Sequence, residues 1–123
     1  MAGSKHMNSL IQLLQEAGGP LSADEIRECL GRRSIGQATI YRLLKQGVEN
    51  SQINELSFPN SPNRFEISGL KHHHHFICDE CDRVYDIEGC FKQVSDLAPK
   101  GFKVNDHDIL LRGQCDQCVG VSA

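Results

Sequence analysis

The chain has 123 residues and a formal net charge of −3, so its length allows one domain or two small ones. Charged residues make up an ordinary 24% of it, and this balance by itself points to neither a nucleic-acid nor a membrane partner. The sequence has no apolar run of bilayer length and no signal peptide, which predicts a cytoplasmic protein without a membrane partner. Residues 1–6 have the character of a cloning remnant and are left out of the fold prediction.

Three short helices are predicted in the first part of the chain. Apolar residues recur at helical spacing over residues 8–17, and a Gly-Gly-Pro sequence ends that pattern. A second helix follows Ser22, whose hydroxyl group can form a capping box with Glu25. Ser34 is positioned to cap a third helix, in which apolar residues are interspersed with polar and basic ones.

The next two segments, residues 52–58 and 64–67, are strand-like and flank a turn rich in proline and asparagine, which predicts a β-hairpin. Three helices followed by a hairpin is the order of a winged helix-turn-helix, whose third helix enters the major groove of DNA. Four polar side chains of that helix can contact base edges or phosphates: Gln37, Thr39, Tyr41 and Arg42. The pattern alone leaves a helical bundle with a solvated third helix as an equal alternative.

A short polar break near residue 69 marks the predicted boundary between domains 1–68 and 69–123. The second domain is predicted to contain three strands and a short helix, at residues 74–78, 83–87, 102–111 and 91–97 respectively. The predicted fold class is therefore α+β, with an N-terminal winged helix-turn-helix followed by a small α/β dimerisation domain. Such a domain leaves an apolar face and a sheet edge uncovered, which predicts a homodimer. A homodimer would present two recognition helices to a palindromic double-stranded DNA operator.

Two Cys-x-x-Cys pairs, Cys78 with Cys81 and Cys115 with Cys118, lie in the second domain. Four thiolates from two such turns form the closed tetrahedral shell that structural zinc prefers, and metal binding there adds folding free energy. Two disulfides or a thioredoxin-type redox pair are the alternatives, but neither a secretory signal nor a βαβ pattern accompanies the cysteines. The spacing therefore predicts a structural zinc site.

Four consecutive histidines precede the first cysteine pair in a strand-like segment. Because side chains alternate between the two faces of a strand, His72 and His74 should face one side while His73 and His75 face the other. The run is thus interpreted as parts of two different metal sites, each of which needs ligands from elsewhere in the chain.

Several longer motifs occur together along nearly the whole chain: Leu21-Ser22-Ala23-Asp24-Glu25-Ile26, Ala38-Thr39-Ile40-Tyr41-Arg42, Arg64-Phe65-Glu66, residues 72–81, Gly101-Phe102-Lys103-Val104 before His107, and Gly113-Gln114-Cys115. In this combination the sequence resembles the ferric uptake regulator family of metal-sensing bacterial repressors. The resemblance implies a dimeric repressor with a winged-helix half, a dimerisation half, a structural zinc and one or two regulatory metal sites.

The resemblance also implies the ligands of the regulatory sites. A site at the hinge between the halves would use Glu66, His73, His75 and Asp86. A second site would use His72, His74 and His107. Family members usually complete this second site with a glutamate, and the nearest match here is Cys90, beside Glu88. Cys90 as a ligand and Cys90 as a free thiol are equal alternatives.

The regulatory metal is predicted from a departure from the family pattern. Iron and peroxide sensors often carry a histidine where this chain has Pro20, which offers no ligand atom. Four protein ligands suffice for tetrahedral zinc, whereas iron commonly takes more donors. Zinc is therefore the favoured regulatory metal. An Fe²⁺-dependent or peroxide-sensing regulator is the alternative within the family, and a zinc hydrolase is disfavoured because no catalytic motif accompanies the ligands.

Overall fold

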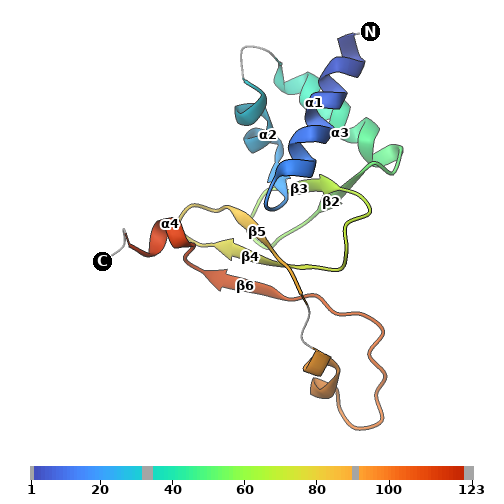
Figure 1. Ribbon diagram of the computed structural model, residues 1–123, viewed down its shortest axis with the longest axis vertical. Coiled ribbons are helices and arrows are strands. Elements are labelled where there is room, and N and C mark those ends of the chain that lie inside the picture. Colours follow the sequence, from blue (N-terminus) through green and yellow to red (C-terminus); the bar gives the residue numbers. More distant parts are fainter. Residues whose placement is uncertain (1, 32–34, 90–91, 121–123) are drawn as a thin grey trace. The chain divides into compact units, whose positions relative to one another are not determined.

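The computed structural model describes residues 2–31, 35–89 and 92–120 (Figure 1). The chain divides into two compact units, Met1–Leu70 and Lys71–Ala123. The first unit combines three helices with a small sheet, and the second contains another small sheet and two short helical segments. This mixture confirms the predicted α+β class. Within the described residues, every helix is too short or too polar to span a membrane.

The helices of the first unit are α1 (Ala2–Glu16), α2 (Ala23–Leu30) and α3 (Gln37–Glu49). Helix α1 begins at Ala2, earlier than the predicted start at residue 8, because the preceding segment holds no proline to stop a helix. The capping box of α2 is confirmed: the Glu25 amide donates to Ser22 Oγ at 3.2 Å, and the Ser22 amide donates to Glu25 Oε1 at 2.9 Å. Gly36 is the N-cap of α3, while Ser34, the predicted cap, lies outside the described residues.

The three helices pack against a sheet formed by β1 (Leu21–Ser22), β2 (Ile53–Leu56) and β3 (Arg64–Ile67), in the order β1-β3-β2. Strands β2 and β3 form the predicted antiparallel hairpin, with Glu55 opposite Phe65. Glycine at position 47 lets α3 approach β2 closely, because a Cβ atom there would overlap the side chain of Ile53. The core of this unit is apolar and includes Leu10, Ile26, Ile40, Leu43, Leu44 and Ile53.

A partly buried ion pair joins α2 to the hairpin. The Arg64 guanidinium on β3 pairs with the Glu25 carboxylate and donates to the carbonyl oxygen of Pro20 at 3.2 Å. The Arg64 side chain is 3% exposed and that of Glu25 is 29% exposed. Glu25 therefore serves the capping box and the ion pair at once.

The second unit is built on β4 (His74–Cys78), with β5 (Val84–Ile87) antiparallel on one edge and β6 (Leu110–Gly113) parallel on the other. The predicted strand over residues 102–111 was wrong for residues 102–109, which are not in a strand. Both edges of β4 are already occupied, and Phe102 and Val104 are 71% and 36% exposed. The predicted helix at residues 91–97 is a 3₁₀ helix, η1 (Lys92–Leu97), and a helical turn, α4 (Asp116–Val119), follows β6.

Candidate metal centres and nucleic-acid interface

The four cysteines of the two Cys-x-x-Cys pairs converge at one end of the second sheet. Cys78 ends β4 and Cys81 lies in the following turn, while β6 runs parallel to β4 with Gly113 opposite Cys78. The chain therefore leaves β6 beside the end of β4 and brings Cys115 and Cys118 to the same place. All four are free thiols, and their sulfur atoms lie within 4.8 Å of one another.

The sulfur spacing fits zinc. Tetrahedral ligands at a Zn–S distance of about 2.3 Å lie about 3.8 Å from one another. Within this cluster, Cys81 Sγ and Cys115 Sγ are 3.9 Å apart. No large rearrangement is needed for these residues to hold a zinc ion, which would cross-link the turn after β4 to the segment after β6.

Two backbone amides in this cluster favour the thiolate form of Cys78, which is the form that binds a metal cation. The amides of Cys81 and Cys115 approach Cys78 Sγ at 3.5 and 3.4 Å. The Cys81 amide has the largest effect, and together these donors lower the pKa of Cys78 to about 6 against the opposing effect of burial. The hydrogen bond to Cys115 and burial instead raise the pKa of Cys118 to about 12. Binding of a divalent cation would displace the protons that remain on these sulfur atoms.

Tyr85 is a neighbour of this cluster that sequence analysis missed. It lies opposite Phe76 in the β4–β5 register, so both face the side of the sheet that carries Cys78. Its side chain hydrogen-bonds to that of Cys115, which lowers the pKa of Cys115 and helps to raise the pKa of Tyr85 to about 12. Sequence analysis missed Tyr85 because its position beside the cluster depends on the register between β4 and β5.

A histidine cluster lies further along the same face of β4. The ligand atoms of His72, His74 and His107 lie within 4.8 Å of one another. The Nε2 atoms of His72 and His107 are 3.2 Å apart, close to the distance of about 3.4 Å between two nitrogens on a tetrahedral zinc. His74 is buried, and burial first, then His72 and His107, lowers its pKa. Cys90, the tentative fourth ligand, lies outside the described residues.

A hydrogen bond from the Ile109 amide to His74 Nδ1, at 3.1 Å, constrains what this cluster can do. A neutral imidazole that accepts at Nδ1 carries its proton on Nε2. Ligation through Nε2 would move the proton to Nδ1, and ligation through Nδ1 would occupy the accepting lone pair. Metal binding by His74 through either nitrogen therefore breaks this hydrogen bond.

On the opposite face of the sheet, His75 of β4 and His73, which precedes the strand, lie near Asp86 of β5. The Nε2 atoms of His73 and His75 lie 3.6 and 3.5 Å from Asp86 Oδ1. His73 Nδ1 lies 2.7 Å from the Lys71 carbonyl oxygen and can only donate to it, so the neutral ring directs the Nε2 lone pair towards the carboxylate. Two such nitrogens and a carboxylate oxygen suit a cation. Glu66 lies on β3 of the first unit, and its role as a fourth ligand stays a prediction.

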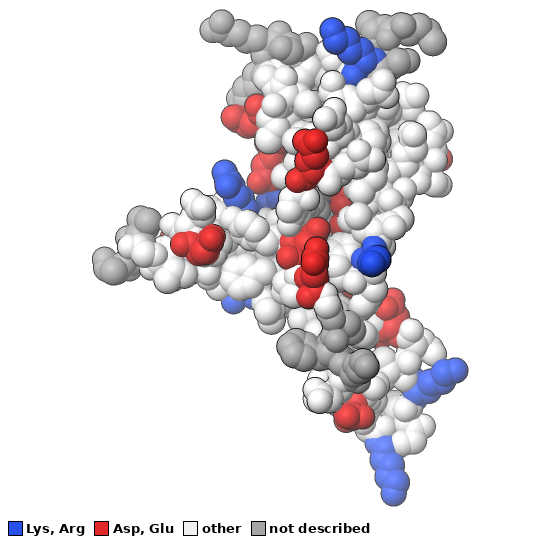
Figure 2. All heavy atoms as spheres, viewed as in Figure 1, with Lys and Arg blue, Asp and Glu red and all other residues white. Residues whose placement is uncertain are grey.

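The predicted DNA contacts occupy the solvent side of α3. Gln37, Tyr41 and Arg42 are exposed and Thr39 is half-buried, whereas the buried face of the helix is apolar. On the face of the molecule in Figure 2, basic and acidic side chains of the described residues are scattered rather than gathered into one basic surface. The exposed polar and basic side chains of α3 are therefore available for contacts with DNA.

Comparison with known proteins decides the family. The family model described as the ferric uptake regulator family matches residues 3–112. The chain is also 31% identical over 116 residues to the ferric uptake regulation protein of Bacillus subtilis, which covers 88% of this chain and 78% of that protein. The chain belongs to the ferric uptake regulator family. Members of this family are metal-responsive, DNA-binding dimeric transcription regulators, so the chain is not an enzyme and the hydrolase alternative is set aside.

Solved structures of ferric uptake regulators share the fold. The regulator of Helicobacter pylori superposes with a TM-score of 0.69 at 22% identity, over 93% of this chain and 79% of that one. The Vibrio cholerae regulator superposes with a TM-score of 0.67 at 26% identity, over 89% of this chain and 88% of that one. The winged helix followed by a small α/β unit is thus the family fold.

Proposed function

We propose that this ferric uptake regulator family member is a repressor that binds palindromic operator DNA as a homodimer when its regulatory metal, preferably zinc, is bound. The observation that carries the proposal is the chemistry of the second unit. Its described residues include one all-sulfur cluster and two histidine clusters, so metals can be held with different strengths. A closed four-sulfur shell suits a permanent structural zinc, whereas histidine and carboxylate ligands suit exchange with the surroundings.

The sensory site is proposed on the face of β4 that carries His73, His75 and Asp86. Glu66 from the first unit would complete four ligands, and Gln37, Thr39, Tyr41 and Arg42 would contact the operator. A ligand from each unit would let the metal favour one arrangement of the DNA-binding units. A tenfold gain in DNA affinity corresponds to about 1.4 kcal/mol of coupling, which one or two metal–ligand bonds can supply.

Zinc is favoured over iron by the residue at position 20. Pro20 has no donor atom in its side chain, and its carbonyl oxygen is already hydrogen-bonded by Arg64. Four ligands complete a tetrahedral zinc shell but leave an octahedral iron short of donors. Ferrous iron is the second candidate because the carboxylates of Glu66 and Asp86 are hard donors, and because the similar Bacillus subtilis protein is a ferric uptake regulation protein.

Two measurements test the proposal. Metal analysis of anaerobically purified protein, before and after mild chelation, should find one resistant zinc per chain and a second metal that leaves. Fluorescence anisotropy with DNA from the protein's own promoter should then show at least tenfold tighter binding with zinc than with chelator, and a loss of affinity as salt rises.

The matched variants are His75→Ala and His6→Ala, the latter removing a histidine on α1 outside the metal clusters. Only His75→Ala should abolish the response to zinc. Equal DNA affinity with zinc, with ferrous iron under anaerobic conditions and with chelator would refute the sensory role. A response to iron alone would replace zinc by iron as the signal.

A further inference from the structure

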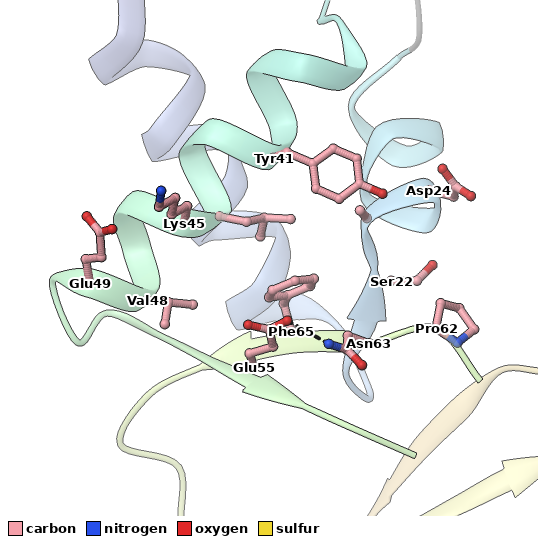
Figure 3. Close-up of a pocket in the computed structure, with 12 residues that line it drawn as sticks. Ser22, Asp24, Tyr41, Lys45, Val48, Glu49, Glu55, Pro62, Asn63 and Phe65 are labelled. Carbon is pink, nitrogen blue, oxygen red and sulfur yellow. Dashed lines mark hydrogen bonds between the residues drawn. The ribbon is translucent and has the colours of Figure 1, made fainter. Parts of the chain in front are cut away.

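The first unit contains a hollow between α3 and the hairpin that shares only Tyr41 with the metal and DNA contacts described above. Its volume is about 590 Å³, within the range of small-molecule sites, which runs from about 300 to 1,000 Å³. Figure 3 shows the rings of Tyr41 and Phe65 and the side chain of Val48 facing it from α3 and β3. Leu44 adds a buried apolar side chain to the lining.

The polar part of the lining is mainly acidic. Asp24, Glu49 and Glu55 contribute three carboxylates, against the single ammonium group of Lys45. Glu55 lies beside the floor, where Asn63 Nδ2 donates to its Oε2 at 2.8 Å and holds the carboxylate in place (Figure 3). A concave surface with excess negative charge repels phosphate and attracts cations, so the hollow is a poor place for the DNA backbone.

We infer that this hollow binds a small organic cation with an aromatic ring, such as an arylalkyl amine. The ring would pack between Tyr41, Phe65 and Val48, while the ammonium group would lie near the Glu55 carboxylate and the face of the Tyr41 ring. Both parts of such a ligand find a complementary group, whereas an organic anion of the same shape would meet the carboxylates.

The site would act on DNA binding through Tyr41, which is 51% exposed and lines the hollow. A ligand packed against its ring would cover part of the surface that α3 offers to an operator. This regulatory consequence rests on the proposed function, but binding of the cation does not. The two can therefore be tested separately.

Tryptamine is a suitable probe because the chain contains no tryptophan, so indole fluorescence reports the ligand alone. Its fluorescence anisotropy is titrated with the full-length, metal-loaded protein in the absence of DNA. Indole-3-propionate, with a similar ring and the opposite charge, is the ligand control. Saturable binding of tryptamine at one per chain, at least tenfold tighter than that of indole-3-propionate, is expected.

Glu55→Gln tests the site, and Asp96→Asn is the matched control because it changes the net charge equally. Asp96 is exposed on η1 in the other unit. Glu55→Gln should weaken tryptamine binding at least fivefold, Asp96→Asn should leave it within twofold, and Val48→Phe should block it by filling the hollow. Equal binding of both probes, or equal effects of the two charge variants, would overturn the assignment. If tryptamine binds as expected but does not weaken operator binding, the ligand site stands and its regulatory role is refuted.

Discussion

Replacing Arg64 with methionine should destabilise the first unit, because it removes the buried partner of a partly buried ion pair. Loss of a partner in a fully buried pair costs about 3–5 kcal/mol. The Glu25 side chain is 29% exposed, so water can rehydrate the carboxylate and reduce that cost. The Pro20 carbonyl oxygen would also lose the donor now at 3.2 Å, and a hydrogen bond contributes about 1 kcal/mol. We expect the free energy of unfolding to fall by about 2–3 kcal/mol.

The assay is urea unfolding of the zinc-loaded protein, followed by far-ultraviolet circular dichroism, with Glu25→Gln and the double variant alongside. Since both residues belong to one network, the double variant should be more stable than the sum of the single losses implies, by at least 1 kcal/mol. The reasoning would be refuted if the free energy of unfolding of Arg64→Met lay within about 0.5 kcal/mol of that of the parent. It would also be refuted if the losses of the two single variants added up to the loss of the double variant. Either outcome would mean that packing, rather than the ion pair, joins α2 to the hairpin.

Three further predictions concern the second unit. Cys118→Ser should abolish the chelator-resistant zinc, measured as metal per chain, and lower the thermal stability of this unit; retention of that zinc would exclude the four-sulfur site. Zinc binding to the cluster of His72, His74 and His107 should speed hydrogen exchange of the Ile109 amide, measured by NMR. The reason is that ligation by His74 removes the nitrogen that accepts the hydrogen bond of this amide. Unchanged exchange when the cluster is fully occupied would contradict the prediction. The Tyr85→Phe variant should release zinc several-fold faster than the parent under peroxide, because Cys115 loses a hydrogen-bond donor. Zinc release is measured with a chromogenic chelator. Equal release rates would show that the hydroxyl group does not protect the cluster.

Local patterns determined much of this protein. Ser22 and Glu25 stand three residues apart before an apolar stripe, and they form the capping box that the spacing predicts. The alternation of side chains predicts that His73 and His75 separate from His74, and the two groups do lie in different clusters. The two Cys-x-x-Cys pairs likewise predict the sulfur cluster. The capping box and the grouping of these side chains agree with the structure because each depends on a spacing that can be read within a short stretch of the chain; the metal ligation itself stays a prediction.

Only the tertiary structure decided the rest. Residues 102–109 are strand-like in sequence, yet they form no strand, and Phe102 and Val104 remain 71% and 36% exposed. Tyr85 meets Cys115, and the Ile109 amide meets His74, through strand registers that join segments about 30 residues apart. The hollow beside Tyr41 likewise depends on how α3 packs against the hairpin. Composition and periodicity carry no information about such pairings, because register and packing are set by which surfaces can be buried together.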